Sequence, residues 1–169
     1  LDSGEPHEPR VDPGSPGDVW WAYGPDEDTV WLVGEAGRIF RYSRADESFT
    51  PISSPTDETL FGIWGPPGGP LYAVGGYVPP ATGQAVIVRI EGDTASLVTD
   101  LPASIDPKEL FFKVWGLSAD ELWVIGDRGG VLHLENGTWS RQVLPSSPRL
   151  VTLHGSGGDD VVIVGGGAN

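Results

Sequence analysis

The chain of 169 residues contains neither cysteine nor methionine, and it carries few cations. Without cysteine, a disulfide scaffold and a thiolate metal site are both excluded. Methionine is missing even at position 1, so we expect a processed product or a piece of a longer protein. The 10 Lys and Arg residues face 24 Asp and Glu residues, which gives a formal net charge of −14. That sign is a poor match to phosphate backbones and argues, more weakly, against anionic membrane surfaces.

Long hydrophobic runs and helical periodicity are also missing. The apolar runs extend over four to six residues, whereas a membrane-spanning helix needs roughly 20. No apolar period of 3.6 residues continues over ten residues, so no helix is expected. No signal peptide is recognisable either.

The first 18 residues form an acidic segment rich in Pro and Gly, with two apolar residues. Such a segment cannot bury enough surface to offset the entropy lost on ordering, so we expect an extended leader or linker over 1–18. Two interpretations stay open. One is a tether between an exported domain and a membrane anchor, as in a lipoprotein, which would place the protein at the cell surface, in the periplasm or outside the cell. The other is a plain disordered terminus.

The rest of the chain repeats a twelve-residue unit four times, at 23–34, 64–75, 115–126 and 154–165. Each unit opens with a ring and a glycine, continues through a polar turn, and closes with an apolar run and a glycine. The opening residues Tyr23, Trp64, Trp115 and His154 are 41, 51 and 39 positions apart. Repeats of about 40–50 residues that hold several short strands are typical of β-propeller blades.

Strand candidates in each unit are separated by Gly, Asp, Ser and Pro. In order along the units they are 19–23, 60–64, 111–115 and 150–154 (first), 30–33, 71–74, 122–125 and 161–164 (second), 39–42, 86–90 and 131–134 (third), and 49–52, 94–98 and 139–144 (fourth). The second strands are apolar at every position, so we expect both of their faces to be covered, as when blades stack. Arg41, Arg89 and His133 occupy one column of the third strands.

Unit three carries V-W-G-L-S-A-D-E-L-W-V-I-G-D-R-G-G-V-L-H-L-E-N-G-T-W over 114–139. It resembles a family of bacterial, mostly exported β-propellers with V-W-G … D-[VL]-W-[AV]-V-G … G-x-[IV]-[LV]-H repeats. Its end, E-N-G-T-W (135–139), is similar to the Asp-box turn of photosystem-assembly-factor and sialidase-like propellers, although the leading Ser and the Asp are missing. The resemblance implies four-stranded blades and a scaffold used mainly for binding.

We therefore predict an all-β fold, a β-propeller segment of about three and a half four-stranded antiparallel blades. The blades are expected at about 19–59, 60–109, 110–149 and, as a partial blade, 150–169. Such a segment does not close a ring, and an open apolar edge promotes aggregation. We expect strands from another chain, from a second copy or from a longer parent to continue the sheet beyond Val164.

Glycines are expected to shape the turns. Gly37 and Gly129 should have positive φ in the hairpins between second and third strands. Gly65, Gly116 and Gly155 should end the first strands and open the turns, with a positive φ at Gly116.

The candidate partner-binding site is the insertion in unit two, where residues 75–84 replace a four-residue turn. Insertions in repeat proteins often lie on the binding face. The candidate residues are Tyr77, Val78, Pro79, Pro80, Thr82 and Gln84. Of the seven Trp residues, six fall in repeat columns and are expected to pack between blades. Trp20 is the least constrained by the repeat and is the candidate exposed aromatic residue.

Signals for metal binding and catalysis are weak. Residues 155–167 resemble one calcium-binding nonapeptide, with Asp159 and Asp160 as candidate ligands, but such sites need stacked copies. A structural turn is the favoured interpretation, as it is for the carboxylates of 26–28 and 120–121, because Asp in turns accepts backbone N–H bonds. His7, His133 and His154 are too scattered for a ligand set, and a local hydrogen bond is expected for each.

No G-x-S-x-G nucleophile elbow is present, and no catalytic residue or cofactor is predicted. The sequence predicts a non-catalytic binding or scaffold propeller at a bacterial surface or in the periplasm, with protein partners. The alternative is a carbohydrate-binding, lectin-like propeller. An Asp-box glycosidase fragment is the third interpretation.

Overall fold

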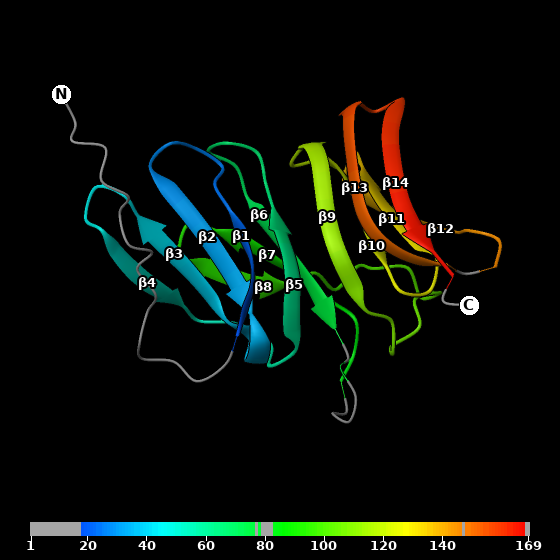
Figure 1. Ribbon diagram of the computed structural model, residues 1–169, viewed down its shortest axis with the longest axis horizontal. Helices are drawn as coiled ribbons and strands as arrows, with labels where there is room; N and C mark the ends of the chain where they lie inside the picture. The colour runs from blue at the N-terminus through cyan, green and yellow to red at the C-terminus, as the bar shows by residue number, and fades with distance from the viewer. Residues whose placement is uncertain (1–17, 77, 79–82, 147, 168–169) are drawn as a thin grey trace.

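The computed structural model describes residues 18–76, 78, 83–146 and 148–167 (Figure 1). The leader 1–17 lies outside these residues, as do Tyr77, Pro79, Pro80 and Thr82 of the candidate loop. The described part of the chain forms fourteen strands and one 3-10 turn, η1 (Glu35–Gly37). It contains no helix long and apolar enough to cross a membrane.

The strands form four antiparallel sheets that succeed one another along the chain, and within each sheet the strands follow chain order. The first sheet contains β1 (Val19–Tyr23), β2 (Thr29–Gly34), β3 (Ile39–Ser43) and β4 (Ser48–Ile52). The second contains β5 (Thr59–Trp64), β6 (Leu71–Gly76), β7 (Val86–Glu91) and β8 (Thr94–Leu97). The third contains β9 (Phe111–Ser118), β10 (Glu121–Gly126), β11 (Gly130–Glu135) and β12 (Thr138–Val143), and the fourth contains β13 (Arg149–Gly157) and β14 (Asp160–Gly166).

The first strand of each sheet contacts the first strand of the next, so that β1, β5, β9 and β13 lie next to one another. We call these four strands the inner strands. The sheets extend outward from them to β4, β8 and β12, and Figure 1 shows the sheets following one another from the blue end of the chain to the red end. This arrangement of four-stranded sheets is that of propeller blades. The prediction of an all-β, partial β-propeller is confirmed.

The second strands pack on both of their faces in the middle of the array. On β6, Leu71 and Ala73 belong to the buried cluster against the first sheet, whereas Tyr72 and Val74 belong to the cluster against the third. The residues of β10 are divided in the same way between the second and fourth sheets. Continuous apolar runs are therefore required at these strands.

β14 has one covered face among the described residues, and the expectation that strands from elsewhere cover the other face stays a prediction. Val161 and Ile163 pack against the third sheet, but Val162 and Val164 are 60% and 55% exposed. The reason is that, among the described residues, no further sheet lies on the outer face of β14. An apolar run shows that a strand is able to have both faces buried, while its neighbours decide whether it does.

The turn glycines agree with the sequence in part. Gly37 and Gly129 have φ of 68° and 69°, as expected. Gly65 follows β5, but Gly116 and Gly155 lie inside β9 and β13, and the expected positive φ at Gly116 is wrong. A Cβ on Gly116 would lie 2.6 Å from Leu122 Cβ and 2.8 Å from the Trp64 ring. Close packing against β10 of its own sheet and against Trp64 of the second sheet, rather than backbone conformation, therefore explains this glycine.

Hydrogen bonds from tyrosines join neighbouring sheets. The Tyr23 hydroxyl donates to the Gly65 carbonyl at 2.7 Å, and the Tyr72 hydroxyl donates to the Ala119 carbonyl at 3.1 Å. Each bond runs from one sheet to the turn after the inner strand of the next. Both fix the orientation of successive sheets.

Arg41, Arg89 and His133 occupy the same position of successive third strands, and each pairs with an aromatic residue of the second strand. The pairs are Trp31 with Arg41, Tyr72 with Arg89, and Trp123 with His133. His133 departs from the expected local hydrogen bond. Its ring stacks on Trp123 at 4.4 Å between ring centroids, and its buried Nε2 has no hydrogen-bond partner among the described residues.

Candidate functional site

Each inner strand contains a register shift at the same place. The pairing with the second strand passes over Trp20 in β1, Phe61 in β5, Phe112 in β9 and Val151 in β13. A β-bulge of this kind leaves one residue out of the ladder and changes the direction of its side chain. We call these four residues the bulge row.

The rings of the bulge row contact one another from strand to strand. The ring centroids of Trp20 and Phe61 are 5.8 Å apart, and those of Phe61 and Phe112 are 5.7 Å apart. Aromatic pairs at such distances attract each other beyond the effect of area burial. The two ends of the row are open, since Trp20 is 50% exposed and Val151 is 55% exposed. The three rings thus form a continuous apolar strip across β1, β5 and β9, and Val151 holds the corresponding position on β13.

Trp20 was a sequence candidate, and the structure places it at one end of this strip. The sequence missed Phe61, Phe112 and Val151 as members of a site. A signal was present in the sequence, because the second position of each predicted first strand is a large apolar residue. These residues are Trp20, Phe61, Phe112 and Val151. A bulge is visible only in the pairing of backbones, so the common column looked like part of an ordinary apolar run.

Two cations lie on rings beside the row. The Lys113 Nζ lies 2.7 Å from the centroid of the Trp21 ring, and the Arg149 guanidinium lies 5.3 Å from the centroid of Phe112. Cations at such distances are attracted by the ring quadrupole. Burial lowers the pKa of Lys113 to about 8.

Lys113 reaches from β9 to β1 across β5, at Gly62. A Cβ on Gly62 would lie 2.8 Å from the Phe112 carbonyl oxygen and 3.3 Å from Lys113 Cα. The glycine therefore permits the close approach of β5 and β9. That approach is what brings Lys113 within reach of Trp21.

Four other described cations pair with carboxylates instead of rings. The ion pairs are Arg41 with Asp93 (3.4 Å), Arg89 with Glu91 (2.6 Å), Arg128 with Asp106 (3.1 Å) and Arg141 with Glu109 (2.8 Å). Each of these four arginines therefore already has a carboxylate partner within the chain. Lys113 and Arg149 differ from them in lying on rings of the inner strands.

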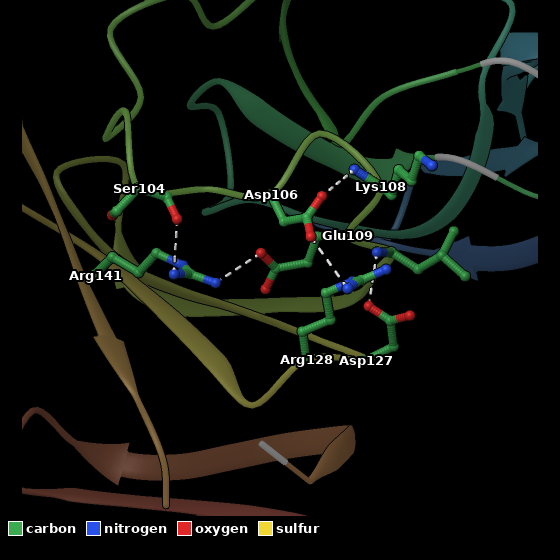
Figure 2. A network of polar contacts seen from close by, with 8 residues as sticks. Ser104, Asp106, Lys108, Glu109, Asp127, Arg128 and Arg141 are labelled. Carbon is green, nitrogen blue, oxygen red and sulfur yellow. Dashed lines mark hydrogen bonds and ion pairs between the residues drawn. The ribbon is translucent and has the colours of Figure 1, made fainter. Parts of the chain in front are cut away.

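A buried polar network holds the connection into β9 (Figure 2). Glu109 is fully buried, and its Oε2 accepts a 2.8 Å hydrogen bond from Arg141, which also donates to the Ser104 carbonyl at 2.9 Å. Burial raises the pKa of Glu109, against the lowering effect of Arg141. Asp127 accepts a hydrogen bond from the Leu110 N–H at 2.9 Å. Because this network ends one residue before β9, we interpret it as the support that positions Phe112 and Lys113.

The predicted turn carboxylates have structural partners. Asp26 Oδ1 accepts bonds from the Thr29 hydroxyl, the Asp28 N–H and the Thr29 N–H, and these bonds lower the pKa of Asp26. Asp160 accepts a 2.6 Å hydrogen bond from the Ser156 hydroxyl, and its neighbour Asp159 is exposed. The described residues contain no cluster of three or more His, Asp or Glu side chains suited to a metal ion.

Of the candidate loop, Val78 and Gln84 are described. Val78 is 38% exposed, and the Gln84 N–H donates to Glu58 Oε1 at 2.9 Å. The loop therefore has one described anchor, on the residue just before β5. Its role in binding stays a prediction.

A hollow of about 310 Å³ lies between the second and third sheets, bordered by Tyr72, Arg89, Asp100, Asp120 and Trp139 among others. Asp93, which pairs with Arg41 across the first junction, is replaced at the second junction by Gly137. Arg89 pairs instead with Glu91 in its own sheet, so the hollow stays open. Its charged groups of both signs define no single ligand.

The strand order, the inner strands and the repeated bulge define a β-propeller segment that presents an apolar strip. No protein-family model matches the chain, and no curated protein matches it. Two solved structures are similar. A structure of YCF48 bound to D1 peptide has a TM-score of 0.42 and 14% identity, with 93% of this chain and 64% of that chain covered. A structure of YCF48 from Cyanidioschyzon merolae has a TM-score of 0.42 and 11% identity, with 94% and 67% covered. This chain thus spans about two thirds of their length.

Proposed function

We propose that this chain is a non-catalytic β-propeller scaffold that binds a polypeptide partner on the bulge row. The observation that carries the proposal is the exposure of the row at Trp20 and Val151. Other Trp residues of the repeat, such as Trp31 and Trp123, are buried between sheets. Apolar surface left exposed beside polar groups marks interaction sites, and Trp is among the residues that contribute most to binding.

The shape and chemistry of the row favour a polypeptide over a glycan. A sugar is held by a flat ring with hydrogen-bonding side chains close by, whereas the row ends in the aliphatic Val151 and its rings are tilted against one another, by 51° for Trp20 and Phe61. Successive apolar side chains of an extended peptide fit a strip of this kind, since pockets for alternate side chains give such complexes their specificity.

A non-catalytic role is supported by how the titratable side chains are used. Asp26 and Glu109 are committed to hydrogen bonds that hold the fold, and Lys113 lies on a ring. We further propose that binding takes place outside a bacterial cell, at its surface or in the periplasm. The support for this location is the acidic, Pro- and Gly-rich composition of residues 1–18. Protease treatment of intact cells, of cells with a permeabilised outer membrane and of lysed cells tests it, and protection that is lost only on lysis would contradict it.

A linear peptide library panned on the wild-type protein and on two variants tests the function. Trp20→Ser removes the exposed ring of the row, and Leu97→Ser removes an exposed side chain of similar accessibility on β8, away from the row. We expect peptides that bind the wild-type and Leu97→Ser proteins and lose binding to Trp20→Ser. Enrichment that ignores Trp20 would overturn the site. Failure to enrich peptides, together with Trp20-dependent signals on a glycan array, would favour the lectin alternative.

A further inference from the structure

The bulge row has a charge as well as an apolar surface. We propose that it selects an acidic segment, an extended peptide in which apolar side chains alternate with Asp or Glu along one face, and that Lys113 and Arg149 bind the carboxylates. This inference rests on the proposed function and adds the chemistry of the partner. It uses two cations that lie on rings of the inner strands and have no ion pair with a carboxylate among the described residues.

The two cations lie on either side of Phe112, in the middle of the row. Lys113 follows Phe112 on β9 and points across β5 toward Trp21, whereas Arg149 approaches the Phe112 ring from β13. An apolar side chain seated on Phe112 would therefore have a cation on each flank. Residues at positions i and i+2 of an extended peptide lie on the same face, so an Asp or Glu two positions before or after that apolar side chain would lie on the face that meets the two cations.

Both cations keep donors available for a ligand. A ring attracts a cation through its face but accepts few of its hydrogen bonds, and an ammonium has three N–H donors while a guanidinium has five. Arg41, Arg89 and Arg141, by contrast, already donate to carboxylates of this chain. A carboxylate is the ligand that would bind the available donors of Lys113 and Arg149 most tightly, because charge-assisted hydrogen bonds are stronger than neutral ones.

The proposed preference for an acidic partner is opposite to the preference that the overall charge of the protein predicts. A chain of net charge −14 attracts basic partners at long range, but exposed charges farther apart than about 8 Å are largely screened at physiological ionic strength. Contacts within the row then decide the affinity. If contacts within the row decide the affinity, an acidic segment binds more tightly than a basic one. If the overall charge decides it, the order is reversed, so an experiment can distinguish the two cases.

Three synthetic peptides of equal length test the preference. On the face that meets the row, all carry the same Phe, Leu and Val residues in alternation with the test residue, which is Glu, Gln or Lys, and the opposite face carries Ser. Binding is measured by calorimetry and by the fluorescence of the protein's Trp residues in buffer of physiological salt. We expect the Glu peptide to bind about tenfold more tightly than the Gln peptide, which corresponds to one charge-assisted contact, and the Lys peptide to bind least.

The variants Lys113→Gln and Arg149→Gln identify the groups responsible, and Lys108→Gln, at an exposed lysine outside the inner strands, is the matched control. Each of the first two should reduce the Glu-over-Gln preference severalfold, whereas Lys108→Gln should keep it. Arg149 is exposed, so its variant remains informative if Lys113→Gln fails to fold. Equal binding of the Glu and Gln peptides, or tightest binding of the Lys peptide, would overturn the charge preference while leaving the proposed function standing. Absence of binding by all three would count against the proposed function itself.

Discussion

Lys113 of the third sheet places its ammonium 2.7 Å from the centre of the Trp21 ring of the first sheet. The contact passes over the second sheet at Gly62, whose backbone lies against Phe112 and Lys113. One side chain thus connects the inner strands of three successive sheets. The bulge row lies one residue away on each of these strands, so the same contact also holds its rings in line.

The first prediction concerns the pH dependence that Lys113 gives to stability. Burial lowers its pKa from the ordinary 10.5 to about 8 in the folded protein. Between those two pH values the unfolded chain holds a proton that the folded chain has lost, so the contribution of Lys113 to the free energy of unfolding rises with pH. Urea unfolding of the wild-type protein and of Lys113→Met, from pH 7.5 to 10.5, measures the difference.

We expect the wild-type protein to gain stability relative to Lys113→Met as the pH rises through this window. Other titrating groups are shared by the two proteins and cancel in the comparison. Parallel pH profiles would show that Lys113 titrates as an ordinary exposed lysine.

The second prediction separates close packing from backbone conformation. Gly116→Ala should lower the free energy of unfolding by about 1–3 kcal/mol, because its Cβ would overlap Leu122 and the Trp64 ring in a packed interior. Gly157→Ala is the control, since a Cβ at that position meets nothing within 4 Å, and it should change stability by no more than about 0.5 kcal/mol. Chemical unfolding of both variants measures this, and equal effects would refute the packing account.

The strands and their repeat columns could be predicted from the sequence because glycines recur between short apolar runs. The burial of a given run could not. Val162 and Val164 have the same pattern as the buried Tyr72 and Val74, and the difference lies in whether another sheet packs on them.

The candidate site was found from the sequence at Trp20 alone. A bulge changes the pairing of backbones without changing the order of apolar residues, so Phe61 and Phe112 could not be distinguished from core residues of β5 and β9. Glu109 was missed for a different reason. It stands among Asp106 and Lys108 in a polar connection, where a glutamate is ordinarily exposed, and its burial depends on Arg141, which is distant in sequence.

The third prediction concerns the buried pair of Glu109 and Arg141. Removing either partner leaves the other charge buried, so Glu109→Ala and Arg141→Ala should each lower the free energy of unfolding by about 3–5 kcal/mol. The double variant leaves neither charge unpaired and should lose about 1–3 kcal/mol less than the sum of the two single changes. Equilibrium unfolding of the four proteins gives this coupling energy. Strict additivity would show that the 2.8 Å contact does not contribute to stability.

The fourth prediction concerns the insertion in unit two. Replacing residues 76–86 by D-R-G-G, the turn of unit three (127–130), should leave the cooperative unfolding transition intact, because this turn already joins equivalent strands, in which Ile125 pairs with Val131 as Val74 pairs with Ile87. If the insertion also binds a partner, the shortened protein should capture that partner less well while still binding a short peptide on the bulge row. Thermal unfolding and peptide binding separate the two effects. Loss of cooperative folding would assign the insertion a structural role.

The bulge row as a ligand surface is tested most directly by the indole N–H resonances of the seven Trp residues during titration with the Glu peptide. Trp20→Phe and Trp21→Phe variants assign the two resonances of the inner strand β1. The account predicts that these two resonances shift in a saturable manner, while those of Trp31, Trp123 and Trp139, which are buried between sheets, stay in place. Saturable binding with unchanged Trp20 and Trp21 resonances would contradict it.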